Sequence, residues 1–529
     1  MAHINTGSSS IASAVKLLVA ALGAGSVIGA ASAATVDMTR VIVSFKPGAA
    51  AQARAAVAAA RGDVKEEIFG MDAIAIEVPR LALKALQANP NIAYVEQDQL
   101  REPFALTSPS TGTPYVLGQS VPYGIKMVQA DLLRDANAGN RKVCIIDSGY
   151  DRSHEDLSAN AVTGEYDSGT GWWYTDENSH GTHVAGTIAA INNSGTGVVG
   201  VNPNRTLKLH IVKVFGRSGW AYSSSLASAA NKCGAAGANV ISMSLGGGAA
   251  NATEQNAFAA LASKGVLNIA AAGNSGNTTV MYPAGYSSVM MVGAVNEAKQ
   301  WASFSQYNSK VEIAAPGVGV LSTVPGAASG AVMPFLQVGA RVFAPGTLTG
   351  APVKTATAPL AGFGNGSVVN TAVSGKVCLI ARGTVDFATK VSNCQRSGGV
   401  GAVIYNNVAG AFSGTLGTTV VTIPAVTASD TEGAALRTML GQSATVAMRR
   451  SGSGGYSYFD GTSMATPHVA GVAALVWSYF PTCTGNQIRA SLGRSAQDLG
   501  TAGRDTKYGY GLVQAKAAYD RIRSVGCGN

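Results

Sequence analysis

Charged residues are scarce in this 529-residue chain: Asp, Glu, Lys and Arg make up 13% of it, whereas hydrophobic residues make up 47%. This composition excludes a disordered protein and is sufficient for two or three domains with buried cores. The net charge of +9 does not come from a basic run, because lysine and arginine are scattered along the chain without interleaved aromatic residues. We therefore expect no nucleic-acid partner.

Long apolar runs are also missing after the N-terminus, so we expect no membrane anchor. Residues 1–34 contain an early lysine, Lys16, then an apolar run over 17–30 and the small residues Ala31-Ser32-Ala33. This pattern is typical of a secretory signal peptide that is cut near residue 33 or 34, and the run is too short and too rich in glycine for an anchor. The sequence therefore predicts a secreted protein.

Cysteine is rare as well, with six residues and no CxxC pair, which disfavours zinc. An even number of cysteines in an exported chain predicts disulfides. The expected pairs are Cys378 with Cys394, which flank one short segment, Cys483 with Cys527, which both lie near the C-terminus, and, by elimination, Cys144 with Cys233.

Hydrophobic patterning divides the remaining chain into segments. Residues 35–104 alternate strand-like and helix-like stretches, as in a small α+β unit. Over 105–326, after a polar linker, strands alternate with helices in the manner of a parallel α/β sheet, and this pattern resumes over 452–529. Residues 327–451 are richer in Gly, Thr and Val, which predicts a mainly β domain inserted in a surface loop.

Several elements of the α/β region can be placed from the sequence. We expect strands at Lys142 to Asp147, Leu209 to Val214, Asn239 to Ser244 and Val266 to Ala271, and helices at Val184 to Asn192 and Ser223 to Cys233. Functional residues of open parallel sheets collect at the carboxyl ends of the strands. Asp147, Ser244 and the turn that holds Asn274 all lie at such ends.

The segment GTSMATPHVAG, residues 461–471, places Ser463 at the start of a strongly apolar helix. The free N–H groups and the dipole of a helix N-terminus favour negative charge. A serine at this point can use its own N–H to stabilise the oxyanion that forms when its hydroxyl attacks a carbonyl. The alternative is that Thr462 or Ser463 only caps the helix.

A nucleophilic serine needs a base, and the segment NSHGTHVAG offers His180 and His183 at the start of another apolar helix. Asp147 ends a buried strand and could orient such an imidazole. A zinc site at the two histidines is disfavoured, because the corresponding zinc motif spaces its histidines four residues apart with a glutamate between them.

Four motifs occur together: DSG at Asp147, HGTHVAG at His180, AAGNSG at Asn274 and GTSMATPHVAG at Ser463. The chain order Asp, His, Ser is that of the subtilisin triad. Through these motifs, residues 119–326 and 456–515 resemble the subtilase family of serine peptidases, which implies a subtilisin-like parallel sheet flanked by helices. The alternative is a catalytically silent fold used for binding, which the four intact positions disfavour.

The resemblance implies a role for each of these residues. Ser463 would be the nucleophile, His180 the general base and acid, and Asp147 its orienting partner, while the Asn274 side chain and the Ser463 N–H would form the oxyanion hole. The implied activity is that of an endopeptidase that cuts proteins and peptides through an acyl-enzyme. His183 would only pack in the helix. We expect a monomer.

Residues 35–104 resemble the inhibitor propeptide of subtilases, which assists folding and then occupies the substrate cleft. The closing strand of that unit would lie at 95–98, and self-cleavage after Phe104 would place an aromatic residue in the primary specificity pocket. The rival junction lies just before Gly118 or Gln119. The resemblance thus implies a precursor whose propeptide is an intramolecular inhibitor.

The resemblance also implies a structural Ca²⁺ site, since hard cations of this kind take oxygen ligands. The matching positions are the side chains of Gln119, Asp156 and Asn193 and the carbonyl groups of Ile191, Thr196 and Val198. The alternative is a plain Asn/Gly turn at 192–197.

Specificity is expected to depend mainly on the substrate backbone, since Ser244-Leu245-Gly246 resembles the segment that pairs with an extended peptide. Met281 takes the position at the floor of the primary pocket, and its apolar thioether predicts hydrophobic P1 residues. Within the insert, residues 374–407 resemble a protease-associated domain, which would contact substrate or partners or act as a spacer.

Overall fold

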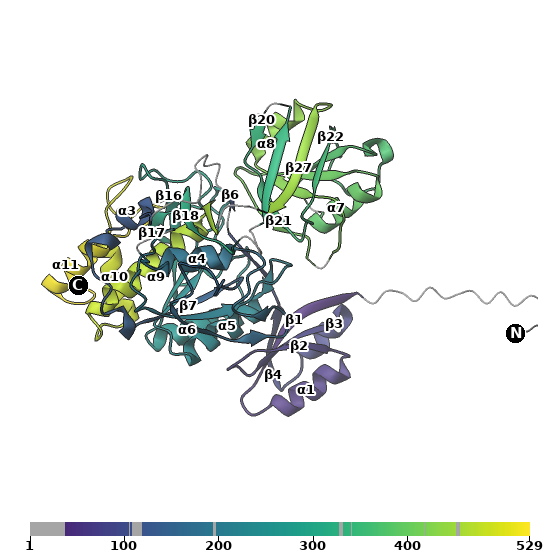
Figure 1. The fold of residues 1–529 in the computed structure, drawn as a ribbon. Coiled ribbons are helices and arrows are strands. Elements are labelled where there is room, and N and C mark those ends of the chain that lie inside the picture. Colours follow the sequence, from purple (N-terminus) through teal and green to yellow (C-terminus); the bar gives the residue numbers. More distant parts are fainter. Residues whose placement is uncertain are drawn as a thin grey trace, which may run out of the picture.

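The computed structural model describes residues 37–104, 106–107, 119–193, 197–326, 332–339, 341–383, 385–417, 419–450 and 455–529. The expected signal peptide lies outside these residues, as does most of the linker. Three units are visible: a large α/β unit, a small N-terminal unit and an inserted β-rich unit (Figure 1). In the described ranges, no helix is both long and apolar enough to cross a membrane.

The large unit is built on a seven-stranded sheet in the order β17-β16-β15-β13-β7-β11-β8. Every pair of neighbouring strands in it is parallel, which confirms the α/β architecture expected from the sequence. The strands are β7 (Lys142–Asp147), β8 (Ala161–Gly164), β11 (Lys208–Lys213), β13 (Val240–Met243), β15 (Leu267–Ala271), β16 (Val289–Val295) and β17 (Val311–Pro316).

Two hydrophobic cores cover the two faces of this sheet. Successive residues of β7 point to opposite faces, so Val143 belongs to one core and Cys144 to the other. The helices around the sheet are α4 (His180–Ala189), α5 (Ser223–Ala235), α6 (Ala252–Ser263), α9 (Thr462–Tyr479), α10 (Gly485–Arg494) and α11 (Ala515–Val525).

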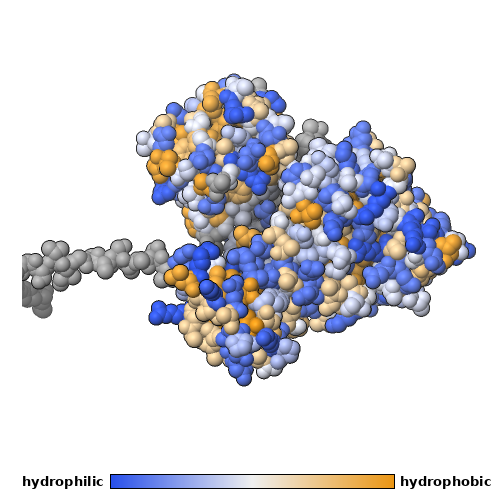
Figure 2. Space-filling view, turned by 180° about the vertical axis from the view of Figure 1, so that it is seen from behind, coloured by the Kyte–Doolittle hydropathy of each residue, from blue (hydrophilic) through white to orange (hydrophobic). Residues whose placement is uncertain are grey.

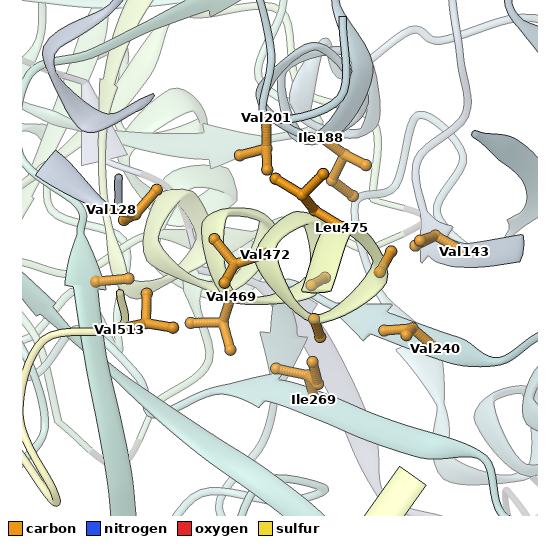
Figure 3. Packing of buried hydrophobic residues seen from close by; sticks show 14 of the residues in the cluster. Val128, Val143, Ile188, Val201, Val240, Ile269, Val469, Val472, Leu475 and Val513 are labelled. Atoms are coloured by element: carbon orange, nitrogen blue, oxygen red, sulfur yellow. The ribbon is translucent and has the colours of Figure 1, made fainter. Parts of the chain in front are cut away.

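Helix α9 is central to the larger core, since it is buried from Thr462 to Ser478. Its residues Val469, Val472 and Leu475 point toward side chains of the sheet and of α4 (Figure 3). This burial explains why the segment is apolar on all sides, as the sequence indicated. A helix so enclosed gives the residues at its N-terminus a rigid support.

The predicted bounds of α4 were wrong at both ends. The helix begins at His180 because the Asp176 carboxylate accepts hydrogen bonds from the N–H groups of Ser179 and Thr182, at 2.9 Å each. It ends at Ala189, since the chain then turns and Ile191 donates its N–H to the carbonyl of Asp156 at 2.8 Å. His180 is therefore the first helical residue.

The N-terminal unit is a four-stranded antiparallel sheet in the order β2-β3-β1-β4 with two short helices. Its elements are β1 (Met38–Phe45), α1 (Ala50–Ala59), β2 (Asp63–Glu67), β3 (Ala73–Pro79), α2 (Leu83–Gln87) and β4 (Ile92–Gln97). After β4 the chain leaves this unit, and β5 (Leu100–Pro103) and β6 (Leu106–Thr107) join sheets of the large unit.

The insert forms a nine-stranded sheet in the order β20-β19-β27-β22-β23-β24-β26-β21-β25. Its strands are β19 (Val332–Val338), β20 (Arg341–Phe343), β21 (Gly346–Thr349), β22 (Thr355–Gly362), β23 (Val377–Ala381), β24 (Gly401–Tyr405), β25 (Gly414–Thr415), β26 (Ala425–Ala428) and β27 (Ser443–Arg450). Helices α7 (Phe387–Arg396) and α8 (Asp430–Arg437) complete it. The insert and the N-terminal unit project from the same side of the large unit (Figure 2).

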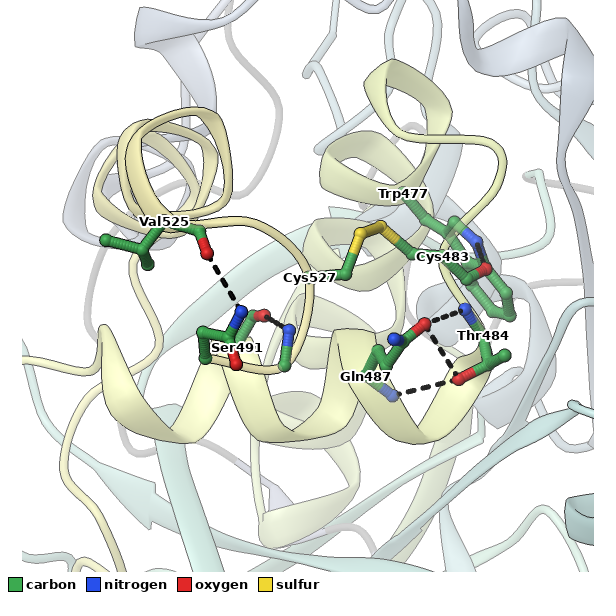
Figure 4. The surroundings of a disulfide bond; sticks show 9 residues. Trp477, Cys483, Thr484, Gln487, Ser491, Val525 and Cys527 are labelled. Carbon is green, nitrogen blue, oxygen red and sulfur yellow. Dashed lines mark hydrogen bonds between the residues drawn. A yellow bond between two sulfur atoms is a disulfide. The ribbon is translucent and has the colours of Figure 1, made fainter.

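Three disulfides join the pairs that the sequence indicated, namely Cys144 with Cys233, Cys378 with Cys394 and Cys483 with Cys527. The last of these connects the start of α10 to the tail after α11 (Figure 4). Beside it, Trp477 Nε1 donates to the carbonyl of Cys483 at 2.8 Å. The disulfide therefore fastens the C-terminal helices to the end of α9.

Candidate active site

Asp147 and His180 form a buried pair at the carboxyl end of β7. Asp147 Oδ1 lies 2.7 Å from His180 Nδ1 and also accepts a 2.7 Å hydrogen bond from the N–H of Ser148. The two side chains are 0% and 2% exposed. Within the described part of the chain, His180 Nε2 has no hydrogen-bond partner, so this nitrogen is free to take a proton.

Ser463 is the second residue of α9 and is completely buried. Its hydroxyl donates to the carbonyl of Ser244 at 2.8 Å, and Ser244 Oγ donates in return to the carbonyl of Ser463 at 2.8 Å. The residue at the N-cap position is Gly461, so neither Thr462 nor Ser463 caps the helix. The Ser463 hydroxyl thus lies at the positive end of the helix dipole without a capping role.

Asn274 follows β15 and presents its amide N–H to the carbonyl of Phe104, at 2.7 Å. Its Oδ1 accepts hydrogen bonds from both the N–H and the hydroxyl of Thr462, at 2.9 Å each. Because an N–H can only donate, the contact with the Thr462 N–H identifies Oδ1 as the oxygen and directs Nδ2 at Phe104. The sequence suggested for Thr462 only a capping role, whereas the structure uses it to orient Asn274.

The segment that leaves the N-terminal unit runs through the same site. Strand β5 lies between β12 (Ala221–Tyr222) and β14 (Leu245–Gly246), and both pairings are antiparallel. The Phe104 N–H donates to the carbonyl of Ser244 at 3.2 Å. Beyond it, β6 pairs with β28 (Tyr456–Asp460). Residues 100–104 therefore enter the site as an extended peptide, and residues 106–107 leave it as a strand.

The Phe104 side chain is buried against Gly246. A Cβ atom placed on Gly246 would lie 2.7 Å from Cε2 of this ring, so only glycine leaves room for it. Met281 is half-buried, and its Cγ would lie 2.9 Å from a Cβ atom on Gly273, beside Asn274. The ring of Phe104 is thus buried against Gly246, while Asn274 holds its carbonyl.

Two acidic residues dock the N-terminal unit on helix ends of the large unit. The Glu96 carboxylate accepts hydrogen bonds from the N–H groups of Ala252 and Thr253 at the start of α6, at 2.7 and 2.9 Å. The Asp98 carboxylate accepts one from the N–H of Ser224 at the start of α5, at 3.0 Å. Carboxylates are favoured at helix N-termini, where free N–H groups and the dipole attract negative charge.

A cavity of about 670 Å³ lies between the site and the insert. It is bordered by Glu102 of β5, by His180 and Arg217 of the large unit, and by Thr349 of the insert. Desolvation raises the pKa of Glu102 to about 7, and the Arg382 guanidinium of the insert opposes this shift. The insert therefore forms one wall of the space beside the extended segment.

Five of the six residues proposed as Ca²⁺ ligands lie together. Gln119 Nε2 is 2.7 Å from the carbonyl oxygen of Ile191 and 3.2 Å from that of Val198. Asn193 Nδ2 is 2.6 Å from Asp156 Oδ1. Thr196 lies outside the described residues. One carboxylate, two amides and two carbonyls fit the oxygen-rich shell of Ca²⁺, and an amide presents its oxygen by turning over.

Comparison with known proteins agrees with this fold and site. Residues 139–337 and 376–511 match the model of the subtilase family, and the fold is that of a subtilisin-like serine peptidase. The chain belongs to the subtilase family and is a serine endopeptidase.

Three similar proteins illustrate the relationship. Subtilisin E of Bacillus subtilis (strain 168) is 38% identical over 302 residues, which are 55% of this chain and 75% of that protein. Alkaline elastase YaB of Bacillus sp. (strain YaB) is 30% identical over 462 residues, which are 86% of this chain and 82% of that protein. The crystal structure of psychrophilic subtilisin-like protease Apa1 from Pseudoalteromonas sp. AS-11 is 44% identical, with a TM-score of 0.53, and the match covers 77% of this chain and 99% of that one.

Proposed function

We propose that this chain is the precursor of a secreted endopeptidase that cleaves itself after Phe104 and then hydrolyses proteins at apolar P1 residues. The contact that carries the proposal is the 2.7 Å hydrogen bond from Asn274 Nδ2 to the Phe104 carbonyl. A donor of the oxyanion hole points at the carbonyl oxygen of the peptide bond to be cut, because negative charge develops on that oxygen in the transition state. The apolar preference rests on the buried ring of Phe104 against Gly246.

In the proposed reaction, the Ser463 hydroxyl first turns from the carbonyl of Ser244 toward His180 Nε2. Ser463 Oγ then attacks the carbonyl carbon of Phe104 while His180 Nε2 takes the hydroxyl proton. Asp147 holds the imidazole and stabilises the imidazolium, as its 2.7 Å contact with Nδ1 supports. The Asn274 amide and the Ser463 N–H stabilise the oxyanion. His180 then gives its proton to the departing amine of Ala105, and water releases Phe104 from Ser463 by the same steps in reverse.

After self-cleavage, we propose that residues 37–104 stay in the cleft as an inhibitor. The contacts of β5 with β12 and β14 and the helix-end contacts of Glu96 and Asp98 do not depend on the bond after Phe104. The product would therefore leave slowly. Export by the signal peptide at 1–34 and action as a monomer belong to the same proposal.

We also propose that Ca²⁺ stabilises the mature enzyme at the cluster of Gln119, Asp156 and Asn193. The proposal rests on the chemistry of the donors, which is that of a Ca²⁺ shell. Bound there, the ion would hold Gln119, near the start of the mature chain, against the loop after α4. The proposed contribution of the ion is to stability.

The insert is proposed to act as a protease-associated domain that limits access to the cleft. Thr415 Oγ1 donates to the carbonyl of Ser218, and Thr349 packs against Gly219. These contacts place residues of the insert on the loop that leads into β12. Substrates would then have to enter as extended chains, between the insert and the large unit.

The decisive experiment compares the parent chain with Ser463→Ala and with the control Ser263→Ala, an exposed serine at the end of α6. We expect the parent and the control to be secreted in processed form with Ala105 as the first residue, and Ser463→Ala to accumulate as the precursor. N-terminal sequencing and mass spectrometry measure this. Normal processing of Ser463→Ala, or a first residue at 118 or 119 from the earliest time point, would contradict the proposal.

A further inference from the structure

An ion pair between the N-terminal segment and the large unit is fully buried in the cleft. Arg101 of β5 lies three residues before Phe104, and Glu254 belongs to α6. Arg101 Nε donates to Glu254 Oε1 at 3.0 Å and Nη2 donates to Oε2 at 2.7 Å, while both side chains are 0% exposed. Nη2 also donates to the carbonyl of Ala249 at 2.9 Å.

The glutamate is held in place by its own unit. The Glu254 N–H donates to Asn251 Oδ1 at 3.0 Å, and Tyr286 Oη donates to Glu254 Oε2 at 2.7 Å. Burial, and then the neighbouring carboxylate, raise the pKa of Tyr286, so this hydroxyl remains a donor. The carboxylate is thus positioned before any peptide arrives, which favours recognition over rearrangement.

The two partners do not stay in one chain after processing. Cleavage after Phe104 makes Arg101 part of the departing segment, whereas Glu254 remains in the mature enzyme. A buried carboxylate that has lost its cation is unfavourable, because desolvation is no longer offset by an opposite charge. A new cation that enters with the substrate would restore the pair, whereas an apolar side chain would bury the carboxylate unpaired.

We infer that Glu254 makes the mature enzyme select arginine at P4, the residue three positions before the cleaved one, in its protein substrates. This inference rests on the proposed function and gives it a second specificity element beside the apolar P1 pocket. Arginine is favoured over lysine because its planar group binds both carboxylate oxygens, as Arg101 does. The same pair anchors the inhibitory segment in the precursor.

The test uses the mature enzyme and four chromogenic peptides X-Glu-Pro-Phe, which follow the sequence of residues 101–104. X is arginine, lysine, norleucine or glutamate. We expect kcat/KM to be at least about tenfold higher for arginine than for norleucine, with lysine between them and glutamate lowest. Equal values, or a higher value for norleucine, would overturn the inference without any variant having to fold.

Glu254→Gln keeps the shape of the side chain and removes its charge. The ratio of kcat/KM for arginine over norleucine should then fall to within about threefold of one, because the desolvated charge pair no longer forms. Glu297→Gln, an exposed glutamate after β16, is the matched control and should keep the parent ratio. An unchanged ratio in Glu254→Gln would show that another group selects the P4 residue.

The endopeptidase proposal and the P4 inference can be contradicted separately. If the mature enzyme cleaves all four peptides at similar rates and Ser463→Ala cleaves none, the endopeptidase proposal stands and the P4 inference fails. If the parent protein cleaves none of the peptides and no protein substrate, both fail together.

Discussion

Asn274 shows how one residue is given a single orientation by its neighbours. Its Oδ1 is occupied by two donors of Thr462, so its N–H group has one direction in which to point, toward the Phe104 carbonyl. A preorganised donor of this kind stabilises the transition state without having to reorient during the reaction. The same principle holds for His180, whose Nδ1 is held by Asp147.

At the residue scale, we predict that Asn274→Leu lowers kcat by about 10²–10³ and changes KM little, since loss of one oxyanion donor costs that much. The measurement is steady-state kinetics on a peptide with phenylalanine at P1. Thermal unfolding of the variant serves as the control, because leucine has nearly the same volume and the melting temperature should shift by only a few degrees. A kcat equal to that of the parent would exclude Asn274 from the oxyanion hole.

Helices α4 and α9 each carry a buried histidine that has no part in the proposed reaction. His183 Nε2 lies 3.0 Å from the carbonyl oxygen of Val320, and His468 Nδ1 lies 2.8 Å from that of Met464. Burial lowers the pKa of His183 to about 3 and that of His468 to about 4. Both helices therefore depend on neutral imidazoles for their packing.

At the element scale, these shifts predict a loss of stability in acid. The ordinary histidine pKa is 6.5, so as the pH falls below this value the unfolded chain takes up protons that the folded helices do not. Stability is full above about pH 6.5 and falls toward pH 4 by up to about 1.4 kcal/mol per pH unit for each histidine. Melting temperatures of the Ser463→Ala precursor at several pH values measure this loss without self-digestion.

His468→Leu is the matched variant for this prediction. Leucine cannot be protonated, so the difference in melting temperature between pH 7 and pH 4.5 should become smaller than in the Ser463→Ala background. An unchanged difference would mean that carboxylates, and not His468, dominate the acid response.

The three units of the molecule meet in one cleft. The N-terminal unit supplies the strand that fills it, the large unit supplies both neighbouring strands, and β21 of the insert lies beside β6 at its exit (Figure 1). Docking through Glu96 and Asp98 covers the N-termini of α6 and α5 at the same time. In the proposed precursor, folding of the large unit and inhibition of its site would use the same contacts.

At the scale of the whole molecule, we predict that removal of Ca²⁺ destabilises the mature enzyme. Residues 119–120 meet the loop after α4 through Gln119, Asn193 and the backbone hydrogen bonds of Ser120 with Gly197 and Val199, and the cation would strengthen this contact. Chelation of the inactivated enzyme should lower its melting temperature by several degrees, and added Ca²⁺ should restore it. Asp156→Asn should abolish this response, whereas an identical response in that variant would place the ion elsewhere.

The sequence by itself determined the parallel sheet and predicted the residues of the site. Strand lengths and alternation with helices follow from local hydrophobic periodicity, so β7 was placed to the residue. The motifs around Asp147, His180 and Ser463 predict a chemistry for each residue, because each prediction depends on a short segment: a strand end or a helix start. The three disulfide pairs follow from the positions of the six cysteines, with Cys144 and Cys233 assigned by elimination.

Only the tertiary structure decided which residues from distant parts of the chain contact one another. Arg101 and Glu254 are separated by 153 positions, and nothing in either segment marks them as partners until the two strands beside β5 bring them together. The contact between Asn274 and Phe104, 170 positions apart, arises likewise from packing between units. Periodicity reports on local structure, whereas the pairing of distant charges depends on how complete units dock.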